Sequence, residues 1–233
     1  EAPDVRPVAG ITQISPSDCG FTSCRGVSAH NGLEVPRNAM GDQSGLTFVI
    51  LGASGDLTRR LLFPALHRLM ALKRVAPTTK IIGYAVDDLT TEAFVANLHD
   101  AVAQFGDSVD EDVWPQIVAN TVYVKGDLTP DAVQRLAPLV RGKAIFYLAL
   151  PPPLFGRAAT SLGLAGLADE SSGPRRLVVE KPFGTSSATA LTLQQELRTH
   201  WEEPQIFRID HFLGKETVQN LLVFRLANRF VEA

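Results

Sequence analysis

The stretch Leu46–Leu57, which reads LTFVILGASGDL, decides the fold. Its first part, Leu46–Leu51, is a continuous apolar run of strand length, as expected of a parallel strand that is covered on both faces. Gly52 and Gly55 follow directly, and apolar residues then recur at helical spacing as far as Leu72. We therefore predict a buried strand, a tight glycine turn and a helix over residues 56–73.

Downstream of this unit, strand-like and helix-like runs alternate along the chain. Further strands are predicted at residues 80–86, 121–125, 144–150, 175–180 and 205–209. Further helices are predicted at residues 90–105, 110–118, 130–140, 154–168, 185–200 and 217–230. Pro64 lies inside the first helix, where we expect a kink or a break. The alternation indicates right-handed βαβ units and an α/β fold, a Rossmann-like doubly wound parallel sheet.

The chain divides into three parts by its patterning. Residues 1–45 are rich in Pro and Gly and show no period, so we expect a flexible N-terminal extension. Residues 46–209 form the predicted dinucleotide-binding domain. Residues 210–233 are interpreted as the start of a second, α+β domain, of which only the first helix is present. Both cysteines, Cys19 and Cys24, fall in the extension and form no complete zinc site, so no metal is expected.

Composition limits the classes of function. The 233 residues carry a net charge of −3, which argues against general nucleic-acid binding, because phosphate contact needs a basic surface. No apolar run approaches the roughly 20 residues that span a bilayer, so no membrane partner is expected. The cysteine-free remainder and the absence of a visible export signal favour a cytoplasmic protein.

The glycine turn has the spacing G-x-x-G-D-L at a strand–helix junction, where a dinucleotide site needs close backbone approach to pyrophosphate. Gly52 permits the turn, Gly55 removes a side chain from the phosphate path, and the helix N-terminus supplies N–H donors. We predict coenzyme contacts from Gly52, Ser54, Gly55, Asp56 and Leu57. A purely structural turn is the alternative.

Coenzyme choice is expected at the end of the second strand, where Gly83–Asp88 reads GYAVDD. An acid at this place bonds the ribose 2′-hydroxyl of NAD, whereas an Arg accepts the 2′-phosphate of NADP. Asp87 and Asp88 therefore favour NAD, with Asp87 as the predicted contact. Two alternatives remain: the two acids cap the next helix, or Arg59 or Arg60 serves a phosphate.

Two further stretches place charge at strand ends. Val178–Gly184 reads VVEKPFG, and the following proline holds Lys181 extended and aimed in one direction. Arg208–Glu216 reads RIDHFLGKE, and on a helix His211 and Lys215, four residues apart, would face one way and hold a doubly charged phosphate. The alternative is that these charges lie at a solvated strand end and helix start.

Together, GASGDL, EKPFG and RIDHFLGKE resemble the glucose-6-phosphate dehydrogenase family, over Leu46 to about Phe230. The resemblance implies oxidation of glucose 6-phosphate at C1 to the lactone, the first step of the pentose phosphate pathway. It also implies hydride transfer to NADP or NAD, with NADP the family's usual coenzyme. The full-length protein is expected to be a homo-oligomer.

The resemblance also assigns roles to single residues. It implies that Lys181 contacts the sugar and approaches the nicotinamide, and that the peptide bond to Pro182 is cis. His211 and Lys215 would bind the 6-phosphate. Asp210 would pair with the catalytic histidine and hold its orientation.

Three departures from the family pattern matter. Phe212 stands where the family usually has a tyrosine after the phosphate-binding histidine. The family's NADP-reading arginine is replaced in the Val86–Asp87 region, which leaves the coenzyme preference open. The family's general-base histidine belongs to a later segment, so we expect residues 1–233 to be a fragment that binds nucleotide weakly and turns over glucose 6-phosphate poorly.

Two other functions are alternatives to this one. A short-chain dehydrogenase or epimerase needs a lysine four residues after its catalytic tyrosine. At that distance the tyrosines here are followed by other residues: Tyr84 by Asp88, Tyr123 by Asp127 and Tyr147 by Pro151. A catalytically incomplete nucleotide- or sugar-phosphate-binding module is the second alternative.

Overall fold

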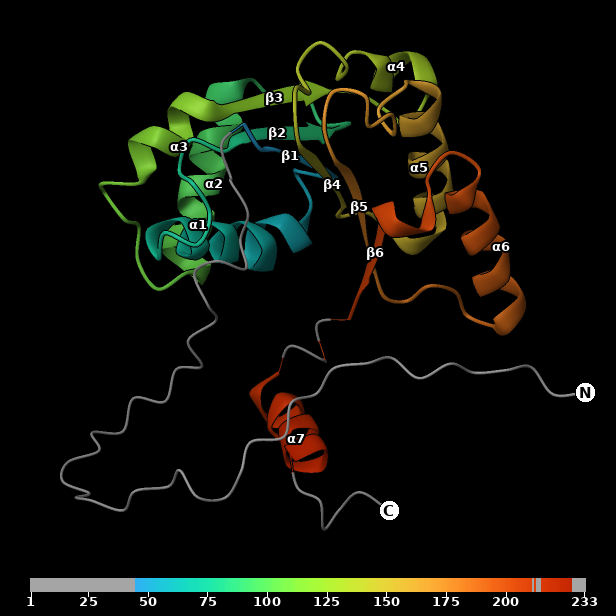
Figure 1. The fold of residues 1–233 in the computed structure, drawn as a ribbon. Helices are drawn as coiled ribbons and strands as arrows, with labels where there is room; N and C mark the ends of the chain where they lie inside the picture. The colour runs from blue at the N-terminus through green and yellow to red at the C-terminus, as the bar shows by residue number, and fades with distance from the viewer. Residues whose placement is uncertain (1–44, 211, 213–214, 228–233) are drawn as a thin grey trace, which may run out of the picture. The chain divides into compact units, whose positions relative to one another are not determined.

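A six-stranded, all-parallel sheet forms the centre of the computed structural model, which describes residues 45–210, 212 and 215–227. Its strands are β1 (Thr47–Leu51), β2 (Lys80–Ala85), β3 (Thr121–Lys125), β4 (Ala144–Leu148), β5 (Arg175–Glu180) and β6 (Ile206–Ile209). They lie in the order β3-β2-β1-β4-β5-β6 (Figure 1). The chain therefore starts at the middle of the sheet and builds outward on one side and then on the other, which confirms the predicted doubly wound α/β fold.

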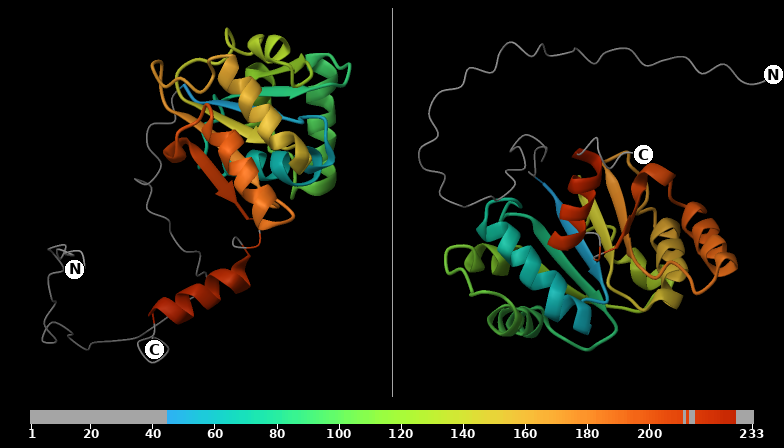
Figure 2. Two further views of the ribbon diagram at one scale, coloured as in Figure 1. Left: turned by 90° about the vertical axis from the view of Figure 1, so that its right-hand side faces the viewer. Right: turned by 90° about the horizontal axis from the view of Figure 1, so that it is seen from below.

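Helices cover both faces of this sheet. They are α1 (Phe63–Ala71), α2 (Thr91–Phe105), α3 (Trp114–Asn120), α4 (Pro130–Gln134), α5 (Phe155–Leu164), α6 (Ser187–Arg198) and α7 (Glu216–Ala227), with short turns η3 (Thr58–Leu62), η4 (Pro152–Leu154) and η5 (Glu203–Gln205). Buried residues of α1, α2 and α3 pack on one face, and those of α4, α5 and α6 pack on the other (Figures 1 and 2). Within the described part of the chain, no helix is both long and apolar enough to cross a membrane.

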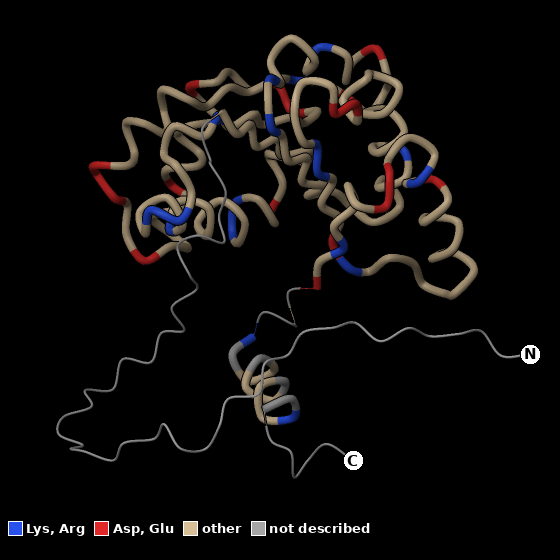
Figure 3. The backbone as a smooth tube through the Cα atoms, in the orientation of Figure 1, with Lys and Arg blue, Asp and Glu red and all other residues tan. Residues whose placement is uncertain are grey.

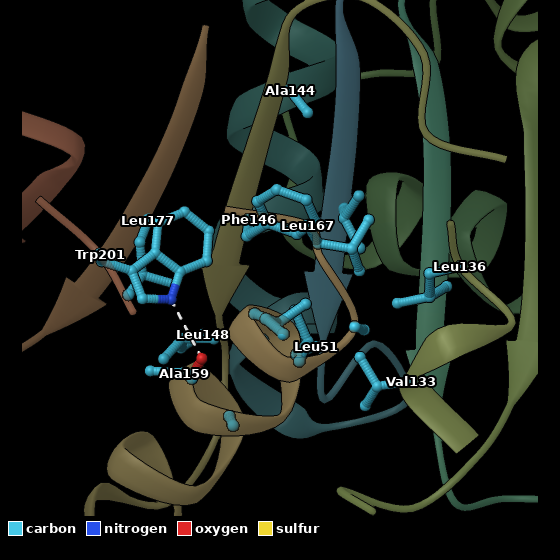
Figure 4. Packing of buried hydrophobic residues seen from close by; sticks show 14 of the residues in the cluster. Leu51, Val133, Leu136, Ala144, Phe146, Leu148, Ala159, Leu167, Leu177 and Trp201 are labelled. Atoms are coloured by element: carbon cyan, nitrogen blue, oxygen red, sulfur yellow. Dashed lines mark hydrogen bonds between the residues drawn. The ribbon is translucent and has the colours of Figure 1, made fainter. Parts of the chain in front are cut away.

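β1 is buried on both sides, as its unbroken apolar run predicts. Val49 and Leu51 contact the core on the α4–α6 face, whereas Ile50 contacts the core on the α1–α3 face, and all three are fully buried. On the first of these faces the Trp201 indole packs edge-on against Phe146 and donates its N–H to a backbone carbonyl of α5 at 3.0 Å (Figure 4). The largest buried polar ring in this core is thereby satisfied.

A kink or a break is predicted at Pro64, but the helical backbone continues through it. The helix instead widens into the π-helical segment η3, in which the Phe63 N–H donates to the Thr58 carbonyl five residues earlier. Pro64 then falls in the first turn of α1, where its missing N–H leaves no bond unmade. Near the proline the structure thus shows a change from π-helical to α-helical hydrogen bonds.

Two predicted helices are shorter than expected because residues near their ends prevent continuation. α4 stops at Gln134, since Pro138 has no N–H to donate to the Gln134 carbonyl and its ring would clash there. α5 ends at Leu164 and not at residue 168, because Gly166 adopts a φ of +71° and its N–H turns back to the Gly163 carbonyl at 2.9 Å.

The helix predicted from residue 110 begins only at Trp114. The Asp110 carboxylate accepts the backbone N–H groups of Asp112 and Val113, at 3.0 and 3.1 Å, and so holds a turn that precedes α3. His200, also predicted to be helical, lies beyond the end of α6 at Arg198. The remaining boundaries agree closely with the prediction, and the predicted extension lies outside the described residues except for Gly45.

His67 is buried in α1 and ties this turn to the helix. Its Nε2 accepts the Asp110 backbone N–H at 3.1 Å, which requires an unprotonated nitrogen. Burial lowers the pKa of His67 below its ordinary value of 6.5, and the nearby Asp110 carboxylate only partly opposes this. The folded protein therefore prefers the neutral imidazole.

We predict that the free energy of unfolding decreases as the pH falls below 6.5. Below that value the unfolded chain binds a proton at His67 while the folded protein does not, so protonation favours unfolding. Urea unfolding at about pH 7.5 and about pH 5.5 measures the effect. His67→Gln, which cannot titrate but still offers an acceptor, should show a smaller difference between the two pH values. An unchanged difference would contradict this account.

Candidate functional site

The candidate site lies at the carboxyl edge of the sheet, where β1 and β4 are neighbours and the strand order reverses. Such a reversal leaves a crevice, because the connections after the two strands leave toward opposite faces. Gly52 follows β1 with a φ of +86°, and a Cβ atom placed on it would lie 2.1 Å from the Ala149 carbonyl oxygen after β4. Only glycine allows the two strand ends to approach this closely.

Hydrogen bonds hold the glycine turn in place. The Gly52 N–H donates to the Tyr84 carbonyl of β2 at 2.8 Å, and the Gly55 N–H closes the turn onto the Gly52 carbonyl at 3.0 Å. The Thr58 hydroxyl donates to the same Gly52 carbonyl at 3.2 Å. The first helix therefore begins directly behind the turn, where its positive dipole end can face an anion.

A cavity of about 390 Å³ opens beside this turn. Its walls come from the ends of four neighbouring strands: Gly52, Ser54 and Gly55 after β1, Tyr84–Val86 at β2, Gly126–Leu128 after β3 and Ala149–Pro151 after β4. Leu154 and Arg157 close it from the helical side. Of the coenzyme contacts predicted from sequence, Gly52, Ser54 and Gly55 line this cavity.

Asp56 and Leu57 do not line the cavity, although both belong to the predicted motif. The Asp56 carboxylate is 75% exposed and forms an ion pair with Arg60 at 3.4 Å. Leu57 packs against the core on the α1–α3 face. Their side chains thus have surface and core contacts, and only their backbone groups remain as candidate phosphate donors.

Asp87 lies next to the glycine turn. Its carboxylate accepts the Ser54 hydroxyl, and its backbone carbonyl accepts the Tyr123 hydroxyl at 2.8 Å. Asp88 forms an ion pair with Lys125 at 3.1 Å. The cap of α2 is the Thr90 side chain, so the capping alternative for the two acids is wrong.

The hydroxyls of the three tyrosines all donate to backbone carbonyls or a carboxylate. Tyr84 donates to the Asp127 carbonyl, Tyr123 to the Asp87 carbonyl and Tyr147 to the Glu180 carboxylate. Burial is the main cause that raises the pKa of all three phenols. A tyrosine that acts as a base needs a lowered pKa, so these surroundings argue against the short-chain dehydrogenase chemistry.

Lys181 and Asp210 meet at the ends of β5 and β6. The Lys181 ammonium lies 3.1 Å from the Asp210 carboxylate, and the Lys181 backbone N–H donates to the Ile209 carbonyl at 3.1 Å. The Lys181–Pro182 peptide bond is cis, as the resemblance implies. Since β4 alone separates β1 from β5, the strand that ends before Lys181 lies roughly 10 Å across the sheet from the strand that ends before the glycine turn.

The segment after Asp210 carries the predicted phosphate ligands. The Phe212 N–H donates to Asp210 Oδ1 at 2.9 Å, while Oδ2 receives the Lys181 ammonium. Lys215, just before α7, places its ammonium 5.3 Å from the centre of the Phe212 ring. His211 lies outside the described residues. Among those that are described, no group of His, Cys, Asp and Glu could hold a metal ion.

Sequence patterning missed the walls supplied after β3 and β4, above all Leu128, Pro151 and Arg157. These residues belong to no recognisable motif. The one available signal was their position, since in a parallel sheet all carboxyl ends meet at one edge. Along the described chain, Lys and Arg are interspersed with Asp and Glu (Figure 3). The charges at the site therefore come from separate side chains and not from a large surface of one sign.

Comparisons with known proteins agree on one family. The family model described as "Glucose-6-phosphate dehydrogenase, NAD binding domain" matches residues 49–220. Glucose-6-phosphate 1-dehydrogenase of Aggregatibacter actinomycetemcomitans is 38% identical over 194 residues, 79% of this chain and 39% of the relative. The Treponema pallidum protein of the same name is 40% identical over 196 residues, covering 79% and 38%. The chain thus spans about two fifths of the length of these curated relatives.

Solved structures give the same result. A glucose-6-phosphate dehydrogenase in complex with glucose 6-phosphate superposes with a TM-score of 0.72 at 33% identity, covering 80% of this chain and 40% of that one. Glucose-6-phosphate 1-dehydrogenase from Mycobacterium avium gives a TM-score of 0.70 at 34% identity, covering 80% and 41%.

We predict that Gly52→Ala destabilises the fold by about 2–4 kcal/mol, because it adds a backbone clash to an unfavourable φ. Gly166→Ala is the matched control, since its φ is also positive but nothing lies within 4 Å of the added Cβ. It should cost only about 1–2 kcal/mol. Denaturant unfolding of both variants gives the comparison. Equal losses would show that the contact with Ala149 does not constrain the turn.

Proposed function

Because the chain belongs to the glucose-6-phosphate dehydrogenase family, we propose that its protein oxidises glucose 6-phosphate at C1 to the lactone and passes the hydride to a nicotinamide coenzyme. The observation that carries this proposal is the Lys181–Asp210 pair, held at the same sheet edge as the glycine turn. An ammonium that could contact a sugar and a turn that could bind a dinucleotide lie at one edge of the sheet, as expected of an enzyme that transfers a hydride from a sugar to a coenzyme. For the full-length protein we also propose a cytoplasmic homo-oligomer.

The coenzyme is proposed to lie across the ends of β2, β1 and β4. Gly52 and Gly55 leave room for the pyrophosphate, and the helix N-terminus behind them offers N–H donors. The cavity beside the turn receives the adenosine half, and Leu150–Pro151 leads from the turn toward Lys181. The bound nicotinamide would supply the hydride acceptor.

The sugar phosphate is proposed to bind over the ends of β5 and β6. The Lys181 ammonium would contact the sugar, orient C1 and stabilise negative charge that develops on its oxygen. Lys215 and His211 would hold the doubly charged 6-phosphate. Asp210, which already accepts two hydrogen bonds in the described structure, is proposed to orient the histidine that removes the C1 hydroxyl proton.

Coenzyme choice is proposed to be relaxed or to lean toward NAD. Asp87 stands at the end of β2 and is held by the Ser54 hydroxyl, so its carboxylate can accept the ribose 2′-hydroxyl of NAD. The residue before it, Val86, lines the cavity and carries no charge for a 2′-phosphate.

The function is tested by titrating the chain with glucose 6-phosphate and with glucose. We predict tighter binding of the phosphorylated sugar, and a loss of about 10–100-fold in Lys215→Ala, since a charge-assisted contact contributes roughly 1.5–3 kcal/mol. Arg225→Ala, on the far end of α7, is the control and should change nothing. Equal affinity for both sugars, or an unchanged affinity in Lys215→Ala, would contradict the phosphate site.

Coenzyme preference is tested by measuring the dissociation constants of NAD⁺ and NADP⁺ for the same chain. We predict values within about tenfold of each other, or tighter binding of NAD⁺, because Asp87 disfavours an additional phosphate. A roughly thousandfold preference for NADP⁺ would show that Asp87 does not select the coenzyme.

A further inference from the structure

Arg157 is the one basic side chain among the described residues that line the coenzyme cavity. Arg59 and Arg60, which sequence patterning offered as phosphate ligands, do not line it, and Arg60 is paired with Asp56. Lys125, at the end of β3, is paired with Asp88. A phosphate in this cavity therefore meets a single candidate cation, on α5.

The Arg157 guanidinium is anchored through one of its nitrogens, which leaves its other N–H groups as possible donors to a ligand. Its Nε donates to the Leu128 carbonyl at 3.1 Å, and its two terminal nitrogens form no hydrogen bond within the described residues. The Asp127 carboxylate, which also lines the cavity, interacts with the guanidinium through its charge without a hydrogen bond. Because the guanidinium is planar, a bond at Nε sets the direction of the whole fork. The free edge offers paired N–H groups, the arrangement that binds a phosphate through two parallel bonds.

This anchor lies on the adenosine side of the cavity. Leu128 follows β3, and Val86 follows β2, the strand whose end carries the group that reads the adenosine ribose. The glycine turn, which is proposed to hold the pyrophosphate, lies beside them after β1. Within a cavity of about 390 Å³, a phosphate on the ribose at the end of β2 comes within reach of an arginine anchored at the loop after β3.

We propose that Arg157 binds the 2′-phosphate of NADP, and so determines whether this protein accepts NADP beside NAD. The inference rests on the proposed function, and it would allow a chain with Val86 and Asp87 at the end of β2 to bind NADP. Asp87, which the Ser54 hydroxyl holds beside the cavity, provides the contact for the NAD ribose, and Arg157 provides the phosphate contact from the cavity wall.

Equilibrium titration of the 233-residue chain and its Arg157→Gln variant with NADP⁺ and NAD⁺ tests this. Arg157→Gln should weaken NADP⁺ binding by about 10–100-fold and change NAD⁺ binding by less than about threefold. The adenosine fragments 2′-AMP and 5′-AMP provide a second comparison, in which only 2′-AMP should lose affinity.

Ser161→Ala is the matched control, because the Ser161 hydroxyl donates to the same Leu128 carbonyl at 2.8 Å but carries no charge. It should leave both coenzymes unaffected relative to each other. If Ser161→Ala weakens NADP⁺ binding as much as Arg157→Gln does, Arg157 only stabilises the loop at Leu128, and the inference is overturned. If Arg157→Gln weakens the binding of both coenzymes equally, Arg157 contacts the pyrophosphate, and the inference is overturned as well. Unchanged NADP⁺ binding in Arg157→Gln overturns it as well. If the unsubstituted chain binds neither coenzyme, the proposed function fails first and this inference fails with it.

Discussion

The contact between the Gly52 backbone and the Ala149 carbonyl is the constraint on which the rest of the site depends. β1 and β4 lie side by side and in register, yet their connections part at this edge, so the two strand ends must pass without a side chain between them. Burial of β1 on both faces prevents the strand from shifting to relieve a clash, because Val49, Ile50 and Leu51 are all fully enclosed. The crevice, its cavity and the start of the first helix follow from that geometry.

The charges at the other end of the site have a different physical role. The Lys181 side chain is 60% exposed and that of Asp210 is 21% exposed, and an ion pair of this kind adds at most about 1 kcal/mol to stability. The pair therefore matters more for where it places the two charges than for the stability that it adds to the fold. It keeps an ammonium and a carboxylate at the ends of β5 and β6, at the same edge of the sheet as the glycine turn.

Local patterning predicted the strands well and several helix ends poorly. The strands are buried on both faces and read as apolar runs, which leaves little ambiguity. Helix ends were misjudged where one residue redirected the backbone, as Pro138 does after α4 and Asp110 does before α3. The motif also does not say which way the Asp56 and Leu57 side chains point once the first turn of helix forms, and neither side chain lines the cavity.

The amino-acid sequence by itself determined the doubly wound sheet, the glycine turn at its centre and the identity of the charged groups at the strand ends. These features depend on the spacing of apolar residues and on the backbone conformations that glycine and proline allow, and both are local properties of the chain. Only the tertiary structure decided that Lys181 meets Asp210, that Ser54 holds Asp87, and that Arg157 faces the cavity beside Leu128. Each of these pairs joins residues 29 or more positions apart, and sheet order alone brings them to one edge.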